Sequence, residues 1–202
     1  MKKFLPILSL LLFGALGSFA QTTGDYRSTG DANWNVLTTW ERWSGAAWVT
    51  PTALEGYPGQ FAVPALVTIL NTDDVNLNVT PANHIGSILI ETGTSKSSIN
   101  FTGTNALIVD GGITIDISTD NTSGKTIAVG AGSLTCASIT MNNVGAGNDP
   151  STLSISTGTV TVSGNISMLG SNTENFVTFS STGTLFIGGT MSGGALTPST
   201  GT

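Results

Sequence analysis

Charged residues are scarce in this sequence. They make up 9% of the 202 residues, and 6 basic residues are outnumbered by 12 acidic ones. Nucleic acids and anionic membrane surfaces are bound through clustered lysine and arginine, so this balance argues against both classes of partner. Glu, Lys, Arg and Gln, which favour helices, are few. The 32 threonines and 26 glycines instead favour short strands joined by turns.

Cysteine and histidine are nearly absent. Cys136 and His84 are the single examples of each, so the chain has no disulfide framework and no closed Cys/His metal site. We expect His84 to occupy a turn, because no nucleophile or orienting partner is evident for it. Paired acids that could hold a single structural Ca²⁺ occur at Asp73–Asp74 and at Asp116 with Asp120, but they do not recur in a regular ladder. We therefore predict no cofactor and no enzymatic activity.

The first twenty residues have the composition of an export signal. Lys2 and Lys3 precede a short apolar stretch, 4–13, and the small residues Ser18 and Ala20 suit a signal peptidase. This stretch is shorter than the roughly 20 residues that span a membrane, and no longer one follows. We expect residues 1–20 to be a signal peptide and predict no transmembrane segment. Its removal would take away two lysines and no acid, shifting the net charge from −6 to −8.

The body of the chain, 63–192, repeats a unit of three short strands. First strands are expected at 99–101, 127–129, 153–155 and 177–179, which lie 28, 26 and 24 residues apart. Second strands are expected at 107–109, 134–136, 160–162 and 185–187, and third strands at 113–115, 139–141, 166–168 and 190–191. An earlier unit with looser spacing combines 67–69, 75–79 and 88–90. These units make about five coils.

A period in the twenties with three strands per unit is typical of a β-solenoid. We predict an all-β fold, a right-handed parallel β-helix in which equivalent inward residues stack in columns. One such column is Leu107, Leu134, Val160 and Leu185, and the outward residues Thr114, Thr140, Ser167 and Thr190 would form a row of hydroxyls. A β-sandwich also has short strands at this spacing, but it has no reason to keep a 26-residue register.

The segment 21–62 differs from the repeats because it is rich in aromatic residues. Trp34, Trp40, Trp43 and Trp48 fall within fifteen positions, and Tyr57 follows. A solenoid needs a cap over the apolar end of its first coil, so we predict an N-terminal cap built on these side chains. The alternative is a sugar-binding platform of the same five residues, since aromatic faces stack on pyranose rings. The two roles are compatible if one tryptophan remains exposed.

Several short motifs in this part of the chain carry a resemblance. They are Gly30-Asp31-Ala32-Asn33-Trp34, Thr38-Thr39-Trp40-Glu41, Tyr57-Pro58-Gly59, Val67-Thr68-Ile69 and Ile85-Gly86-Ser87-Ile88. Their order resembles the opening of large secreted β-helix exoproteins of Gram-negative bacteria, and it is distantly similar to the domain named for its eight glycines. The usual polar Gly-Asp before Val-Thr-Ile is replaced here by the apolar segment 61–66. The resemblance implies an exported surface or matrix protein, commonly an adhesin, and carries over no catalytic residues.

These observations predict a secreted or cell-surface module that acts as an adhesin or stalk and contacts polysaccharide or a host or matrix surface. Residues 193–202 begin a further coil, which suggests a fragment of a longer protein or a crude plug. Uncovered strand edges there would favour end-to-end self-association. The alternatives are a carbohydrate-active β-helix lyase or hydrolase and a purely structural spacer. A groove that gathers two acids with Arg27, Arg42, Lys96 or Lys125 would favour the enzyme.

Overall fold

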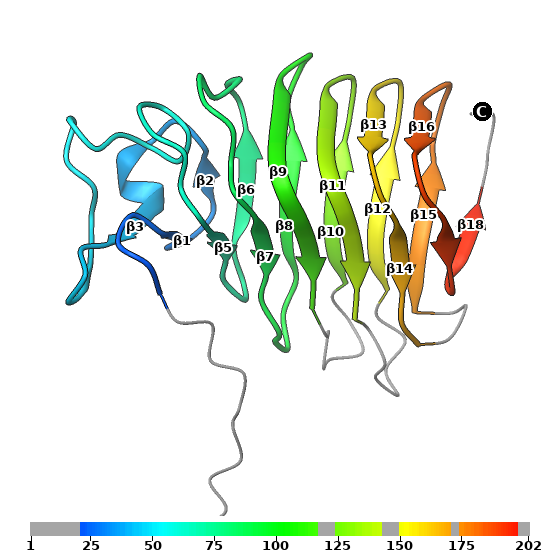
Figure 1. Ribbon diagram of the computed structural model, residues 1–202, viewed down its shortest axis with the longest axis horizontal. Coiled ribbons are helices and arrows are strands. Elements are labelled where there is room, and N and C mark those ends of the chain that lie inside the picture. Colours follow the sequence, from blue (N-terminus) through cyan, green and yellow to red (C-terminus); the bar gives the residue numbers. More distant parts are fainter. Residues whose placement is uncertain (1–20, 117–123, 143–149, 171–173, 198–202) are drawn as a thin grey trace, which may run out of the picture.

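The chain forms short strands that stack along one long axis (Figure 1). The structure is a computed structural model that describes residues 21–116, 124–142, 150–170 and 174–197. The strands are β1 Tyr26–Ser28, β2 Ala32–Asn33, β3 Trp40–Trp43, β4 Trp48–Val49, β5 Val67–Ile69, β6 Asp74–Leu77, β7 Ile88–Ile90, β8 Ser97–Phe101, β9 Ala106–Ile115, β10 Lys125–Val129, β11 Ser133–Met141, β12 Ser151–Ile155, β13 Thr159–Val162, β14 Ile166–Met168, β15 Asn175–Phe179, β16 Thr184–Ile187, β17 Met191–Ser192 and β18 Ala195–Thr197. A short 3-10 turn, η1 Leu37–Thr39, precedes β3.

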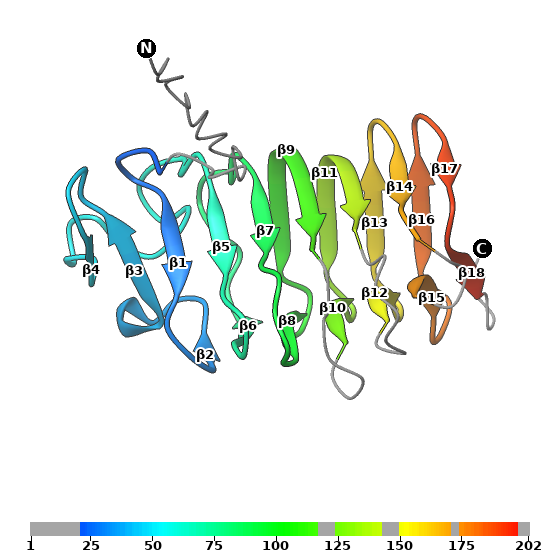
Figure 2. The same ribbon diagram turned by 90° about the horizontal axis from the view of Figure 1, so that it is seen from below.

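The strands belong to two sheets. The larger runs β16-β13-β11-β9-β7-β5-β1-β3-β4, with β14 and β17 beside β11, and the smaller runs β18-β15-β12-β10-β8-β6-β2. Pairing is parallel throughout except for β3, which lies antiparallel to β1 and β4. Each strand therefore pairs with its equivalent in the next coil, as the turned view in Figure 2 shows. The molecule is a β-solenoid of about four turns, which confirms the predicted fold class but not the predicted number of about five coils.

The inward columns are those that the repeat predicts. Leu107, Leu134, Val160 and Leu185 are successive partners, and Cys136 lies between Val109 and Val162. Burial raises the pKa of the Cys136 thiol to about 12, so it stays protonated at neutral pH and acts as a small apolar side chain.

The predicted second and third strands are continuous in β9 and β11. A register shift between Cys136 and Ser138 turns the chain from one face to the next. Gly111 lies at the equivalent corner of β9, where a Cβ atom would come within 2.6 Å of the Gly86 carbonyl oxygen. The corner therefore needs glycine because the backbones of neighbouring coils approach closely there.

The earliest predicted unit is wrong in its first strand, 67–69, and in its second, 75–79. Val67 pairs with Ile88, so β5 and β7 occupy the same face in successive coils. The first strand of that coil is β6, in which Val75 pairs with Ile99, and its second position is held by a single bridge from Ile85. The sequence Val-Thr-Ile alternates correctly for any face, so its pattern alone could not assign it. The outward hydroxyl row also ends at Ser192, which pairs with Ser167, rather than at Thr190.

The segment 21–62 occupies the N-terminal end of the solenoid (Figure 1, blue to cyan). Its strands β1 and β2 pair with β5 and β6, so the parallel ladders begin before residue 63. Trp34 and Trp40 have no exposed surface and their rings lie 4.8 Å apart at the centroids. The Trp40 indole N–H donates to the Trp34 carbonyl at 2.8 Å, and the Trp34 indole N–H donates to the Pro58 carbonyl at 3.0 Å. These two tryptophans are core residues.

A column of polar residues runs inside the apolar core. Ser97, Lys125, Ser151 and Asn175 are successive partners in the smaller sheet, and none of them is exposed. The Lys125 ammonium donates to the Ser97 hydroxyl at 3.0 Å. This column is not predictable from the sequence pattern, because each member stands at an inward position where alternation predicts an apolar side chain.

The pH dependence of stability tests the environment of Lys125. Burial lowers its pKa below the ordinary 10.5, and the nearby Glu91 and Asp116 only partly offset this. Between the lowered value and 10.5 the unfolded chain binds more protons than the folded chain, so stability should rise with pH across that window. We expect Lys125→Met to reduce this rise, measured by urea unfolding from about pH 7 to pH 10.

Lys96→Met is the matched control, because Lys96 is exposed and pairs with Asp74 at 2.7 Å. Stability should rise more steeply with pH in this variant than in Lys125→Met. Equal slopes for the original chain and Lys125→Met would contradict a lowered pKa at Lys125.

Residues 1–20, the expected signal peptide, lie outside the described residues. In the described part of the chain, none of the helical structure is long and apolar enough to cross a membrane.

Candidate functional site: a hollow beside Trp48

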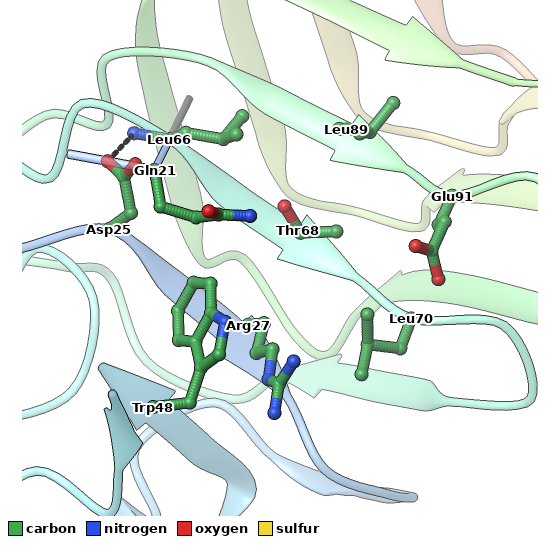
Figure 3. A pocket seen from close by; sticks show the side chains of 9 residues that line it. All are labelled: Gln21, Asp25, Arg27, Trp48, Leu66, Thr68, Leu70, Leu89 and Glu91. Atoms are coloured by element: carbon green, nitrogen blue, oxygen red, sulfur yellow. Dashed lines mark hydrogen bonds between the residues drawn. The ribbon is translucent and has the colours of Figure 1, made fainter. Parts of the chain in front are cut away.

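An open hollow of about 220 Å³ lies on the outer face of the larger sheet, where the solenoid begins. Figure 3 shows Trp48 and Arg27 on one side of it, Leu89 and Glu91 on the other, and Thr68 between them. The remaining lining residues are Gln21, Asp25, Leu66 and Leu70. A second hollow of about 380 Å³ shares Asp25, Leu66 and Leu89 and extends toward Thr114. The two together form a shallow groove along this face.

The floor of the groove follows from strand alternation. Arg27, Thr68, Leu89 and Thr114 are successive partners across β1, β5, β7 and β9, and all point outward because their neighbours in each strand are buried. The same row continues through Thr140 and Ser167 to Ser192. One straight line of outward side chains therefore leads from the hollow along the solenoid.

Trp48 is held in place by a cation and by a second ring. The Arg27 guanidinium lies 4.6 Å from the Trp48 ring centroid, and the Trp43 ring lies 5.4 Å away on the paired strand. Arg27 also forms an ion pair with Glu41 at 2.6 Å, which fixes its guanidinium in the hollow. Trp43 and Trp48 are both partly exposed. The hollow thus combines an ordered aromatic surface with fixed polar groups, the combination that a small polar ligand requires.

The two acids of the hollow differ in their availability. Asp25 is 2% exposed, and its carboxylate accepts the backbone N–H groups of Thr22 at 2.6 Å and Leu66 at 3.0 Å. The Asp25 carboxylate therefore links the backbone at Thr22 to the backbone at Leu66. Glu91 is partly exposed; its backbone N–H donates to the Ile69 carbonyl at 2.9 Å, but its carboxylate makes no hydrogen bond or ion pair with other described residues. Asp25 and Glu91 both line the hollow with Arg27, but only the Glu91 carboxylate lacks a hydrogen-bond partner among the described residues.

The structure divides the predicted aromatic platform. Trp34 and Trp40 are fully buried, so they are removed from the candidate sugar-binding surface: a ring with no exposed face cannot stack on a sugar. Tyr57 is partly buried and packs against the core rather than lining the hollow. Trp43 and Trp48 remain, and Trp48 alone of the five borders the hollow.

The sequence analysis names Arg27 only as one of four cations that a catalytic groove would gather, and Thr68 and Glu91 carry no signal that places them in a site. Arg27 is the central residue of Tyr-Arg-Ser, and Thr68 is the central residue of Val-Thr-Ile, so each outward position was readable. The pairing of β1 with β5 could not be predicted from the sequence, because 38 residues without a repeat separate Ser28 from Val67.

The carboxylates suggested for Ca²⁺ are already engaged. Asp73 accepts the Ser28 hydroxyl at 2.5 Å, and Asp74 accepts Lys96 at 2.7 Å and Ser98 at 2.5 Å. Asp116 accepts the Thr92 hydroxyl at 2.6 Å, and Asp120 lies outside the described residues. Among the described residues, no three His, Cys, Asp or Glu side chains come together as a metal site would need.

His84 and Asp110 form a separate exposed pair, with the His84 Nδ1 atom 2.7 Å from the Asp110 carboxylate. No hydroxyl or thiol that could act as a nucleophile is hydrogen-bonded to this pair within the described part of the chain.

Comparison of the chain with protein-family models, curated proteins and solved structures finds no match.

Proposed function

We propose that the chain is an exported module of the outer surface of a Gram-negative bacterium, an adhesin or stalk that binds polysaccharide. The hollow beside Trp48 is the binding site. The observation that carries this proposal is the ordered Trp48–Arg27 pair at the head of an open groove lined by hydroxyls and carboxylates. The export signal expected in residues 1–20 and the resemblance to secreted β-helix exoproteins support the location.

Sugar recognition combines an apolar aromatic surface with polar groups that accept or donate hydrogen bonds. Trp48 supplies the first, and Thr68, Gln21 and Glu91 supply the second from the opposite side and floor of the hollow. The two hollows are open and share Asp25, Leu66 and Leu89, so more than one sugar unit of a polymer can contact this face. Weak contacts repeated along a chain add up to useful adhesion without one deep pocket.

Binding is favoured over cleavage by the state of the acids. A glycosidase needs two available carboxyl groups on either side of the scissile bond, and Asp25 is committed to two backbone N–H groups. The enzyme alternative therefore depends on Glu91 alone. Reducing ends released from a polysaccharide by the original chain and not by Glu91→Gln would support that alternative.

A binding assay with Trp48→Ala tests the proposal. We expect the variant to lose about 0.5–1.5 kcal/mol of affinity, or roughly 2- to 12-fold, for the polysaccharide that the original chain binds best. The measurement is co-sedimentation with a panel of insoluble glycans and affinity electrophoresis in soluble ones. Trp48 is partly exposed, so circular dichroism should show a folded variant.

Phe186→Ala is the matched control, since Phe186 is an exposed aromatic residue at the opposite end of the solenoid. Its affinity should equal that of the original chain. No binding to any glycan would favour the spacer alternative, and unchanged binding by Trp48→Ala would remove the hollow as the site.

A further inference from the structure

The candidate binding hollow carries more negative than positive charge. Its lining holds two carboxylates, those of Asp25 and Glu91, and one guanidinium, that of Arg27. Arg27 is already paired with a third carboxylate, that of Glu41, at 2.6 Å. An α-amino group at Gln21, created by removal of the export signal, would offset one of these charges and leave the balance negative. The hollow therefore attracts cations and repels anionic ligands.

Glu91 is the acid that a ligand can reach. Asp25 is 2% exposed and accepts two backbone N–H groups, whereas Glu91 is partly exposed and its carboxylate has no hydrogen-bond partner among the described residues. Figure 3 shows Glu91 across the hollow from Trp48. A sugar that lies against Trp48 therefore faces an unengaged carboxylate. The strongest hydrogen bond that such a carboxylate can accept comes from a charged donor.

A second carboxylate follows Glu91 along the solenoid. Ile90 pairs with Ile115, so Glu91 and Asp116 occupy the same position in adjacent coils, about 4.8 Å apart along the axis. Both are partly exposed. The Lys125 ammonium is close enough to interact electrostatically with both, but it has no exposed surface. A polymer on the outer face therefore meets the carboxylates and not the ammonium.

We propose that the hollow selects polysaccharides that carry free amino groups, such as polymers of glucosamine, over N-acetylated and acidic ones. This inference rests on the proposed glycan binding and specifies its ligand class. The apolar face of a sugar ring lies against Trp48, and the ammonium group of the sugar donates to the Glu91 carboxylate. N-acetylation removes that charge. A uronic acid brings a carboxylate toward Glu91 and is repelled.

Oligomers of equal length and linkage, one of glucosamine and one of N-acetylglucosamine, test the proposal, with a polyuronate oligomer as the acidic ligand. Calorimetric titration into the exported chain should be done at about pH 6 and low ionic strength, where protein carboxylates are ionised and the charges are weakly screened. The glucosamine oligomer should bind about fivefold or more tightly than the N-acetylated one. The acidic oligomer should bind most weakly of the three.

Glu91→Gln should remove this preference. Its affinity for the glucosamine oligomer should fall about fivefold, while its affinity for the N-acetylated oligomer stays the same. Asp110→Asn is the matched control, because it removes one negative charge from an exposed acid that lines neither hollow. It should keep the preference. Trp48→Ala should weaken the binding of both oligomers to the same extent, since both share the apolar face of the ring.

The outcomes separate this proposal from the proposed function. Equal affinity of the original chain for the two oligomers, or tighter binding of the acidic one, would overturn the selectivity for amino groups and leave glycan binding standing. Equal losses in Glu91→Gln and Asp110→Asn would mean that binding follows the overall charge of the protein, which also overturns it. No binding to any glycan would overturn the proposed function and this inference with it. Circular dichroism checks that each variant is folded.

Discussion

Replacing Trp40 with alanine should lower the free energy of unfolding by about 3–5 kcal/mol. Trp40 has no exposed surface, its ring packs at an edge against Trp34 and Tyr26, and its indole N–H is satisfied by the Trp34 carbonyl. Alanine would leave a large cavity beneath the first coil and an unpaired carbonyl. Urea unfolding followed by circular dichroism measures the loss.

Trp43→Ala is the control for this change, because it removes the same side chain from a partly exposed position on the same strand. Its cost should be about 1 kcal/mol or less. Similar losses for the two variants would contradict the distinction between a buried tryptophan pair and an exposed one. Trp40→Phe should recover part of the stability, since it refills most of the cavity without restoring the hydrogen bond.

Two adjacent residues of β11 should respond very differently to alanine. Ile139 is fully buried between Ile113 and Ile166 in successive coils, so Ile139→Ala should cost about 2–5 kcal/mol. Thr140 points outward, and Thr140→Ala should change stability by about 0.5 kcal/mol at most. Thermal and urea unfolding of the two variants in the same buffer make the comparison.

The contrast between these variants tests the strand register directly. A slip of one residue would exchange the inward and outward sets of the whole strand. A larger loss for Thr140→Ala than for Ile139→Ala would therefore mean that β11 faces the other way. Equal small losses would mean that this part of the chain does not form a packed coil.

The repeats could be predicted from the sequence because the same packing requirement recurs at a fixed spacing along the chain. Each inward position of β9 to β16 must fill the same space as its partner one coil away, so Leu107, Leu134 and Val160 occupy equivalent places and reveal one another. The first coil has no such copy within reach. The alternation of Val-Thr-Ile is compatible with any face of the solenoid. Only the pairing of Val67 with Ile88 in the structure identifies the face on which it lies.

The candidate site was harder to predict for a related reason. Tryptophans attract attention in a sequence, but whether a given ring is core or surface depends on which elements cover it. Trp34 and Trp40 are covered on all sides, while Trp48, eight residues after Trp40, stands at the edge of a hollow. Neither Arg27 nor Glu91 belongs to a sequence motif that indicates a binding site. They become neighbours only because β1, β5 and β7 lie side by side.

The in-register columns allow the length of such a molecule to change in whole coils. Each strand of the repeats pairs only with its equivalents one coil earlier and one coil later, so the interactions that a coil needs are supplied entirely by its neighbours. A duplicated segment of about 26 residues would meet the same partners and extend the rod by roughly 4.8 Å. Gene duplication and loss within the repeats could therefore set the distance between the Trp48 hollow and the far end of the rod without redesign of either end.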